Sequence, residues 1–135
     1  MIAGEPVAQS HFELLGGQAA VDRLVESFYR RMDTLPVAAT IRALHPPDLS
    51  GSKAMLKKYL AEWLGGPSLY SQERGHPRLR MRHLPFRIGA PERDAWMQCM
   101  RGAMEEVVGS EHLRESLLEK LFKTADWMRN SDNPQ

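Results

Sequence analysis

The histidines are the side chains of this sequence with the widest chemical reach, because imidazole can bind a metal, move a proton or donate a hydrogen bond. The sequence contains His11, His45, His76, His83 and His112. His83 stands out, because it follows Leu79 by four residues at the end of a short predicted helix, and Pro85 then turns the chain. This placement can hold a ring nitrogen toward a ligand. From the spacing alone, a surface histidine stabilised by the helix dipole is the commoner outcome.

Five arginines form the second local anomaly, with Glu73 as the nearby acid. They are Arg74, Arg78, Arg80, Arg82 and Arg87. Arginine pairs well with carboxylate or phosphate, so the segment can bind an anion, although a solvated basic face is common. The sequence shows no helix-turn-helix, zinc-finger or base-stacking pattern, so we do not expect nucleic acid to be the partner.

Two aromatic residues with polar tips, Tyr29 and Trp96, fall on the apolar faces of different predicted helices. Ordinary core packing explains most such residues. If both converge on a cavity, they offer an O–H and an N–H donor to whatever fills it. Cys99 lies on the same apolar face as Trp96, where we expect a small core residue rather than a nucleophile.

Zinc and nucleotide chemistry have no motif in this sequence. No two histidines are four residues apart, and there is no Cys-x-x-Cys, Gly-rich phosphate loop or nucleophile elbow.

Helical periodicity predicts the elements that must position these residues. Apolar residues recur at three- and four-residue steps almost throughout the chain, which indicates an all-α domain of about six helices. Ser10 and Glu13 form a capping-box pattern, and the glycines at 16–17 end that first helix. A longer helix then extends to a break at Pro36, and a corner at 45–48 precedes the next helix.

The second half of the chain is divided in the same way. We expect Ser50 or Ser52 to cap the helix that ends at the glycines at 65–66, and we expect a loop over 67–77. About one and a half helical turns fit into 78–83, before a long helix with Pro91 in its first turn. Gly109 closes that helix, and Ser110 can cap the last one.

Length and charge point to one globular domain. The 135 residues suit a single domain over 1–135, with flexible ends at 1–10 and 130–135. The net charge of +1, the absence of a signal-peptide pattern and the lack of a long apolar run indicate a cytoplasmic protein without a membrane partner.

An ordered set of motifs resembles the group II truncated haemoglobins. It comprises the Phe28-Tyr29 pair, the two glycine pairs, the run from Gly75 to His83 with Pro85-Phe86, and the run from Glu92 to Trp96. The resemblance extends from about residue 12 to residue 128, nearly the whole chain.

The resemblance implies a truncated globin fold, a two-over-two helical sandwich around haem b. It identifies His83 as the proximal iron ligand, and Tyr29 and Trp96 as distal hydrogen-bond donors. His45 stands near the ligand where the family often has tyrosine, and Ser52 stands at the distal gate where the family often has alanine. The implied haem contacts are Leu56, Tyr70, His76, Arg80 and Phe86, with Arg80 and either Tyr70 or His76 as propionate partners.

The implied activity is reversible binding of O₂, NO or CO for oxygen storage, sensing or redox chemistry. Two alternatives remain. The same fold can act as an NO dioxygenase or peroxidase supplied by an external reductase, or the chain can be a helical module that binds an anionic partner through Arg74 to Arg87. A monomer or a homodimer is expected.

Overall fold

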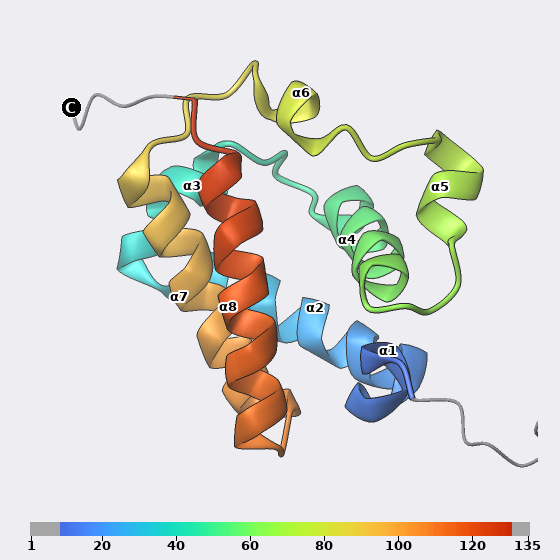
Figure 1. Cartoon of the computed structure of the whole chain (residues 1–135). Helices are drawn as coiled ribbons and strands as arrows, with labels where there is room; N and C mark the ends of the chain where they lie inside the picture. The colour runs from blue at the N-terminus through green and yellow to red at the C-terminus, as the bar shows by residue number, and fades with distance from the viewer. Residues whose placement is uncertain (1–8, 131–135) are drawn as a thin grey trace, which may run out of the picture.

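The fold is a two-layer arrangement of helices, seen in a computed structural model that describes residues 9–130 (Figure 1). All the regular structure within these residues is helical. The elements are α1 (His11–Leu15), α2 (Gly17–Thr34), the 3₁₀ turn η1 (Pro36–Ala38), α3 (Ala39–Ala43), α4 (Ser50–Trp63), α5 (Leu69–Arg74), α6 (Leu79–His83), α7 (Ala90–Val107) and α8 (Glu111–Trp127). None of the helices in this range is both long enough and apolar enough to cross a bilayer.

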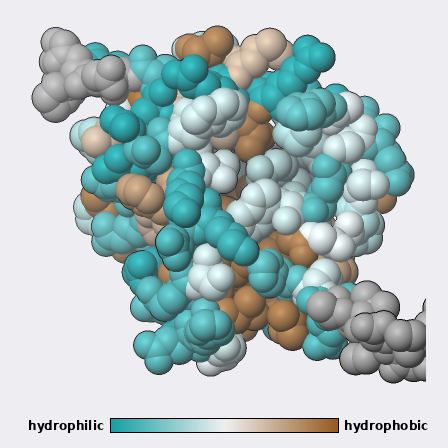
Figure 2. Space-filling view, viewed as in Figure 1, coloured by the Kyte–Doolittle hydropathy of each residue, from teal (hydrophilic) through white to brown (hydrophobic). Residues whose placement is uncertain are grey.

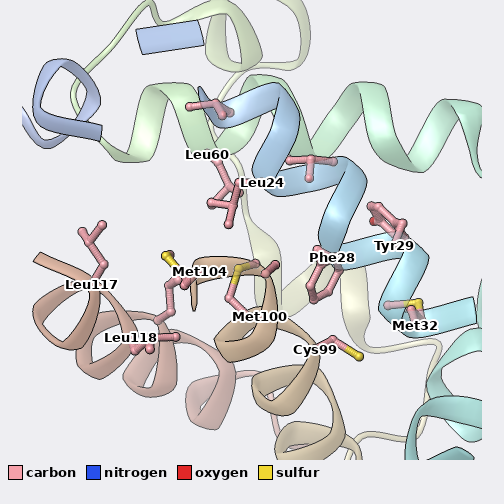
Figure 3. Close-up of a cluster of buried hydrophobic side chains, with 14 of the residues drawn as sticks. Leu24, Phe28, Tyr29, Met32, Leu60, Cys99, Met100, Met104, Leu117 and Leu118 are labelled. Carbon is pink, nitrogen blue, oxygen red and sulfur yellow. The ribbon is translucent and has the colours of Figure 1, made fainter. Parts of the chain in front are cut away.

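The pair α2 and α4 packs over the pair α7 and α8, which confirms the predicted two-over-two sandwich (Figure 1). The core forms between the layers, where each long helix contributes its apolar face. Figure 3 shows Leu24 and Phe28 of α2 facing Met100 and Met104 of α7, with Leu117 of α8 beside them. Burial of this kind stabilises by roughly 25 cal/mol per Å² of apolar surface. The short elements α1, η1 and α3 add Leu15, Ala38 and Ile41 to the same core.

The predicted helix boundaries are largely confirmed. Ser10 accepts from the backbone N–H of Glu13 at 3.1 Å in a capping box, and Gly16 ends α1 with φ of 122°, a conformation that favours glycine. Pro91 lies in the first turn of α7, and the Ser110 hydroxyl accepts from the backbone of Leu113 at the start of α8.

The predicted cap of α4 is wrong, because neither Ser50 nor Ser52 serves as the N-cap. Leu49 occupies that position. The carboxylate of Asp48 accepts from the Ser50 backbone N–H at 2.9 Å and from the Ser50 hydroxyl. An aspartate one residue further upstream therefore satisfies the free N–H at the helix start.

The predicted loop over 67–77 is also wrong in part, because it contains α5. The breaking residues, Pro67 and Gly75, lie outside the helix, so they delimit it rather than interrupt it. Glu62 of α4 accepts from the Ser71 backbone N–H at 2.9 Å and from its hydroxyl. These long-range bonds join α5 to α4 and could not be inferred from local spacing.

The sequence predicts flexible ends at 1–10 and 130–135. Residues 1–8 and 131–135 lie outside the described part of the chain. The flexibility of the ends stays a prediction, but the residue at the inner border of each range makes hydrogen bonds. Ser10 forms the capping box of α1, and Asn130 hydrogen-bonds the segment that follows α6.

Candidate functional site

His83 lies at the end of α6 with its ring orientation set by its own helix. Its Nδ1 is 2.6 Å from the backbone carbonyl oxygen of Leu79. Because a carbonyl can only accept, Nδ1 carries a proton, and in the neutral form of such a ring the lone pair lies on Nε2. No residue within 9–130 bonds that second nitrogen. This is the arrangement of metal-binding histidines, in which a carbonyl holds one nitrogen and the other is available to the metal.

The segment around His83 is exposed, and its apolar residues alternate along the chain with Arg80, Arg82 and Arg87. No residue of α6 is buried. Met81, Leu84 and Phe86 expose 53%, 58% and 40% of their surface. On the face seen in Figure 2, apolar side chains show between polar ones in the area where Figure 1 places α4 and α6. Exposed apolar side chains that gather in one patch mark an interaction site.

Tyr29 is buried on α2, within an aromatic group that joins three parts of the fold. Its ring meets Phe28 edge-on, with centroids 5.0 Å apart, and Phe28 meets Trp96 of α7 at 5.1 Å. The ring of His45, in the corner before α4, lies 5.8 Å from that of Tyr29. The structure therefore joins the three residues predicted to face the gas ligand in one row of ring contacts, which runs from Trp96 through Phe28 and Tyr29 to His45. Figure 3 shows Phe28 and Tyr29 side by side on α2.

The polar tips of Tyr29 and Trp96 have no partner in the described part of the chain. Neither tip is a fully buried atom, because Arg114 Nε is the one fully buried side-chain polar atom without a partner in the described residues, so both donors can reach water or a small ligand. Burial also raises the pKa of Tyr29 to about 12, so the hydroxyl stays protonated and remains a donor at neutral pH. The pair is suited to stabilise negative charge on a small molecule.

His45 repeats the arrangement of His83, since its Nδ1 is 2.8 Å from the backbone oxygen of Ile41. It also lines a surface pocket of about 440 Å³ together with Met32, Leu35 and Pro47. The imidazole thus stands between an open pocket on the outside and the Tyr29 ring on the inside. Ser52 is half-buried on the first turn of α4.

The predicted haem contacts lie on separate elements. Leu56 packs against the core from α4, and Tyr70 of α5 is buried edge-on against Tyr59. His76 accepts from the Arg78 backbone N–H at 3.1 Å. Arg80 donates to the Arg129 carbonyl at 3.4 Å and lies 5.9 Å from the Trp127 ring. No hydrogen bond or ring contact among the described residues joins Tyr70, His76 and Arg80 to one another.

Asn130 is the residue near this site that sequence reasoning missed. Its side chain bonds the backbone of the segment after His83, more than forty positions away along the chain. No local pattern reports such a contact. The one available signal was its position just beyond a helix end, where asparagine is common.

Comparison with known proteins agrees with this geometry. Residues 10–130 match the family described as bacterial-like globin. The chain is 40% identical over 114 residues to the group 2 truncated hemoglobin YjbI of Bacillus subtilis, which covers 84% of each chain.

Solved structures resemble the whole fold. A group II 2-on-2 hemoglobin from Agrobacterium tumefaciens is 45% identical, with a TM-score of 0.88 and coverage of 96% of this chain and 98% of that one. The group II truncated hemoglobin from Bacillus anthracis is 38% identical with the same TM-score and the same coverage. The chain therefore belongs to the bacterial-like globins, within the group II truncated haemoglobins, and this membership implies a haem cofactor.

Proposed function

We propose that the chain binds haem b through Nε2 of His83 and holds O₂, NO or CO reversibly on the opposite side of the haem. The observation that carries the proposal is the hydrogen bond from His83 Nδ1 to the Leu79 carbonyl, which leaves Nε2 as a free, oriented donor of a lone pair. When bound through His83, haem would supply an iron that can hold a diatomic gas.

The chain's own contribution to gas binding is a pair of donors. The Tyr29 hydroxyl and the Trp96 indole N–H are unpaired within residues 9–130 and are joined by contacts of their rings with Phe28. A hydrogen bond to a charged group contributes about 1.5–3 kcal/mol. Such a bond slows gas release by roughly ten- to a hundredfold, at 1.4 kcal/mol per factor of ten.

The remaining predicted contacts complete the pocket in this proposal. Leu56 and Phe86 supply apolar surface for the porphyrin. Arg80 pairs with a propionate, because arginine binds carboxylates well, and Tyr70 or His76 is the second polar partner. Slow gas release suits storage, sensing or redox chemistry better than transport. Because the sequence has no flavin or nicotinamide motif, redox turnover would draw electrons from an external reductase.

The test is an absorption spectrum of the purified protein and of two variants. We expect a Soret band in the wild type and its weakening or loss in His83→Ala. His112→Ala is the matched control, because His112 is an exposed histidine of α8, and it should retain the band. Added imidazole should restore the axial bond in His83→Gly. A folded, colourless wild type that rejects added hemin would refute the proposal and favour the alternative of an anion-binding helical module.

A further inference from the structure

The chain just beyond the end of α8 bonds the segment that carries His83. Asn130, directly after this helix, makes four hydrogen bonds with the segment that connects His83 to α7. Its backbone N–H donates to the Ile88 carbonyl at 2.9 Å, and its Oδ1 accepts from the Ile88 N–H at 2.9 Å. Its Nδ2 donates to the carbonyl of Phe86 at 2.7 Å and to that of His83 itself at 3.3 Å. We call this group of bonds the Asn130 clamp.

The Asn130 clamp holds a segment that has little apolar packing of its own. No residue of α6 is buried, and Leu84 and Phe86 are exposed, so little apolar contact among the described residues fixes the position of His83. The His83 carbonyl is held instead by two donors, Asn130 Nδ2 and the Phe86 backbone N–H at 2.9 Å. A segment held mainly by hydrogen bonds opens more readily than a packed one when those bonds are removed.

The helix that carries Asn130 is itself well anchored. Leu117, Leu118 and Leu121 of α8 are buried in the core. At the end of the helix, Asp126 accepts from Arg93 of α7 at 2.8 Å and from Arg129 at 2.7 Å. The clamp therefore joins a loosely packed histidine segment to the rigid layer formed by α7 and α8.

We propose that Asn130 is a positioning residue for the proximal histidine. It sets the backbone of residues 83–88 so that the His83 ring, oriented from its other side by Leu79, presents Nε2 at a defined place. This inference rests on the proposed haem function, because it assigns His83 to the iron. Asn130 touches no reacting atom and acts only through His83. Supporting groups of this type tune the strength of a metal–histidine bond without belonging to the ligand set.

Two variants separate the bonds of the clamp. Asn130→Ala removes all three bonds of the side chain and keeps the backbone donor. Asn130→Asp keeps an oxygen for the Ile88 N–H but replaces the donor that faces the carbonyls of His83 and Phe86. Thr124→Val is the matched control on α8, because the Thr124 hydroxyl bonds only the Lys120 carbonyl of its own helix.

The first readout is the resonance Raman band of the iron–His83 stretch, together with haem transfer to a scavenger. We expect Asn130→Ala and Asn130→Asp to shift or broaden that band. Both should release haem roughly three- to tenfold faster than wild type, as the loss of one or two net hydrogen bonds implies. Thr124→Val should match the wild type. An unchanged band and an unchanged rate of haem loss in both Asn130 variants would overturn the proposal.

The second readout, amide hydrogen exchange, needs no haem. In the apoprotein, the Ile88 amide should exchange faster in Asn130→Ala than in the wild type. It should stay protected in Asn130→Asp, because the aspartate carboxylate can still accept a hydrogen bond from the Ile88 N–H. Equal protection in all three chains would refute the clamp itself, even if haem binds normally. A wild type that fails to bind haem would overturn the proposed function, and with it the positioning role, while exchange would still report the clamp. If Asn130→Ala fails to fold, Asn130→Asp still carries the first readout, in which an unchanged band and an unchanged rate of haem loss would overturn the proposal.

Discussion

The ring of Phe28 packs against the ring of Trp96 with centroids 5.1 Å apart, which joins α2 to α7 between two unpaired hydrogen-bond donors. Phe28 also meets the ring of Tyr29 at 5.0 Å, so one apolar side chain contacts the rings that carry both donors. Aromatic contacts of this geometry contribute about 0.5–1.5 kcal/mol beyond their burial. The group is therefore both part of the core and the frame of the predicted gas site.

Trp96→Phe tests the indole donor. Phenylalanine retains an aromatic ring for Phe28 but lacks the N–H group. We expect the O₂ dissociation rate to rise by roughly ten- to a hundredfold, as the loss of a hydrogen bond to a charged ligand implies. Stopped-flow or flash photolysis measures that rate. Trp63→Phe is the control, since Trp63 packs on the core from α4 and is not predicted to face the ligand. An unchanged rate in Trp96→Phe would remove the indole from the mechanism.

Tyr29→Phe tests the hydroxyl while keeping the ring contacts with Phe28 and His45. A rise in O₂ dissociation of similar size, about tenfold or more, is expected because one donor is lost. Burial raises the pKa of Tyr29 to about 12, so the hydroxyl should donate across the neutral range. Ionisation of Tyr29 should accordingly cause no change in the wild-type O₂ dissociation rate between pH 6 and pH 9, roughly the range in which His and amino groups titrate. A tyrosinate signal in difference spectra within that range would contradict the assignment.

Phe28→Ala tests the structural role of the central ring. Removing a large, fully buried aromatic leaves a cavity, and the free energy of unfolding should fall by about 3–5 kcal/mol. Urea denaturation followed by circular dichroism measures the change. Phe122→Ala is the comparison, because that ring is 40% exposed on α8, and its loss should cost distinctly less. Equal losses in the two variants would mean that Phe28 is not central to the core.

Acid should weaken the contact between α2 and α7 through Glu106. Hydrogen bonds from Arg30 at 2.6 Å, and from Ser27 and Arg31, hold the pKa of Glu106 below its usual value of 4.5. Because the unfolded chain binds this proton at a higher pH than the folded one, the stabilisation is complete above the unfolded pKa. It is lost as the pH falls through the lowered folded pKa.

Glu106→Gln should therefore unfold at a lower urea concentration than the wild type at about pH 7. The difference between the two unfolding midpoints should shrink toward about pH 3. Glu105→Gln, the exposed neighbour on α7, is the control and should follow the wild type at both values. A difference that stays constant with pH would show that the Glu106 charge does not contribute to stability.

Much of the fold could be predicted from the sequence, because helix formation and capping depend on near neighbours. The apolar spacing, the Ser10 capping box and the break at Pro36 all act within four residues, and the structure confirms them. His83 could be singled out for the same reason. Its helix, its spacing from Leu79 and the proline that follows are local features.

The tertiary structure decided the rest. Tyr29, Trp96 and His45 come from three different parts of the chain, and only the packing of α2 against α7 and of the corner before α4 brings their rings together. Asn130 lies in the predicted flexible end of the chain, yet it bonds a segment more than forty residues earlier in the sequence. Contacts between distant residues form only after the core has placed their helices, so no pattern of neighbouring residues determines them.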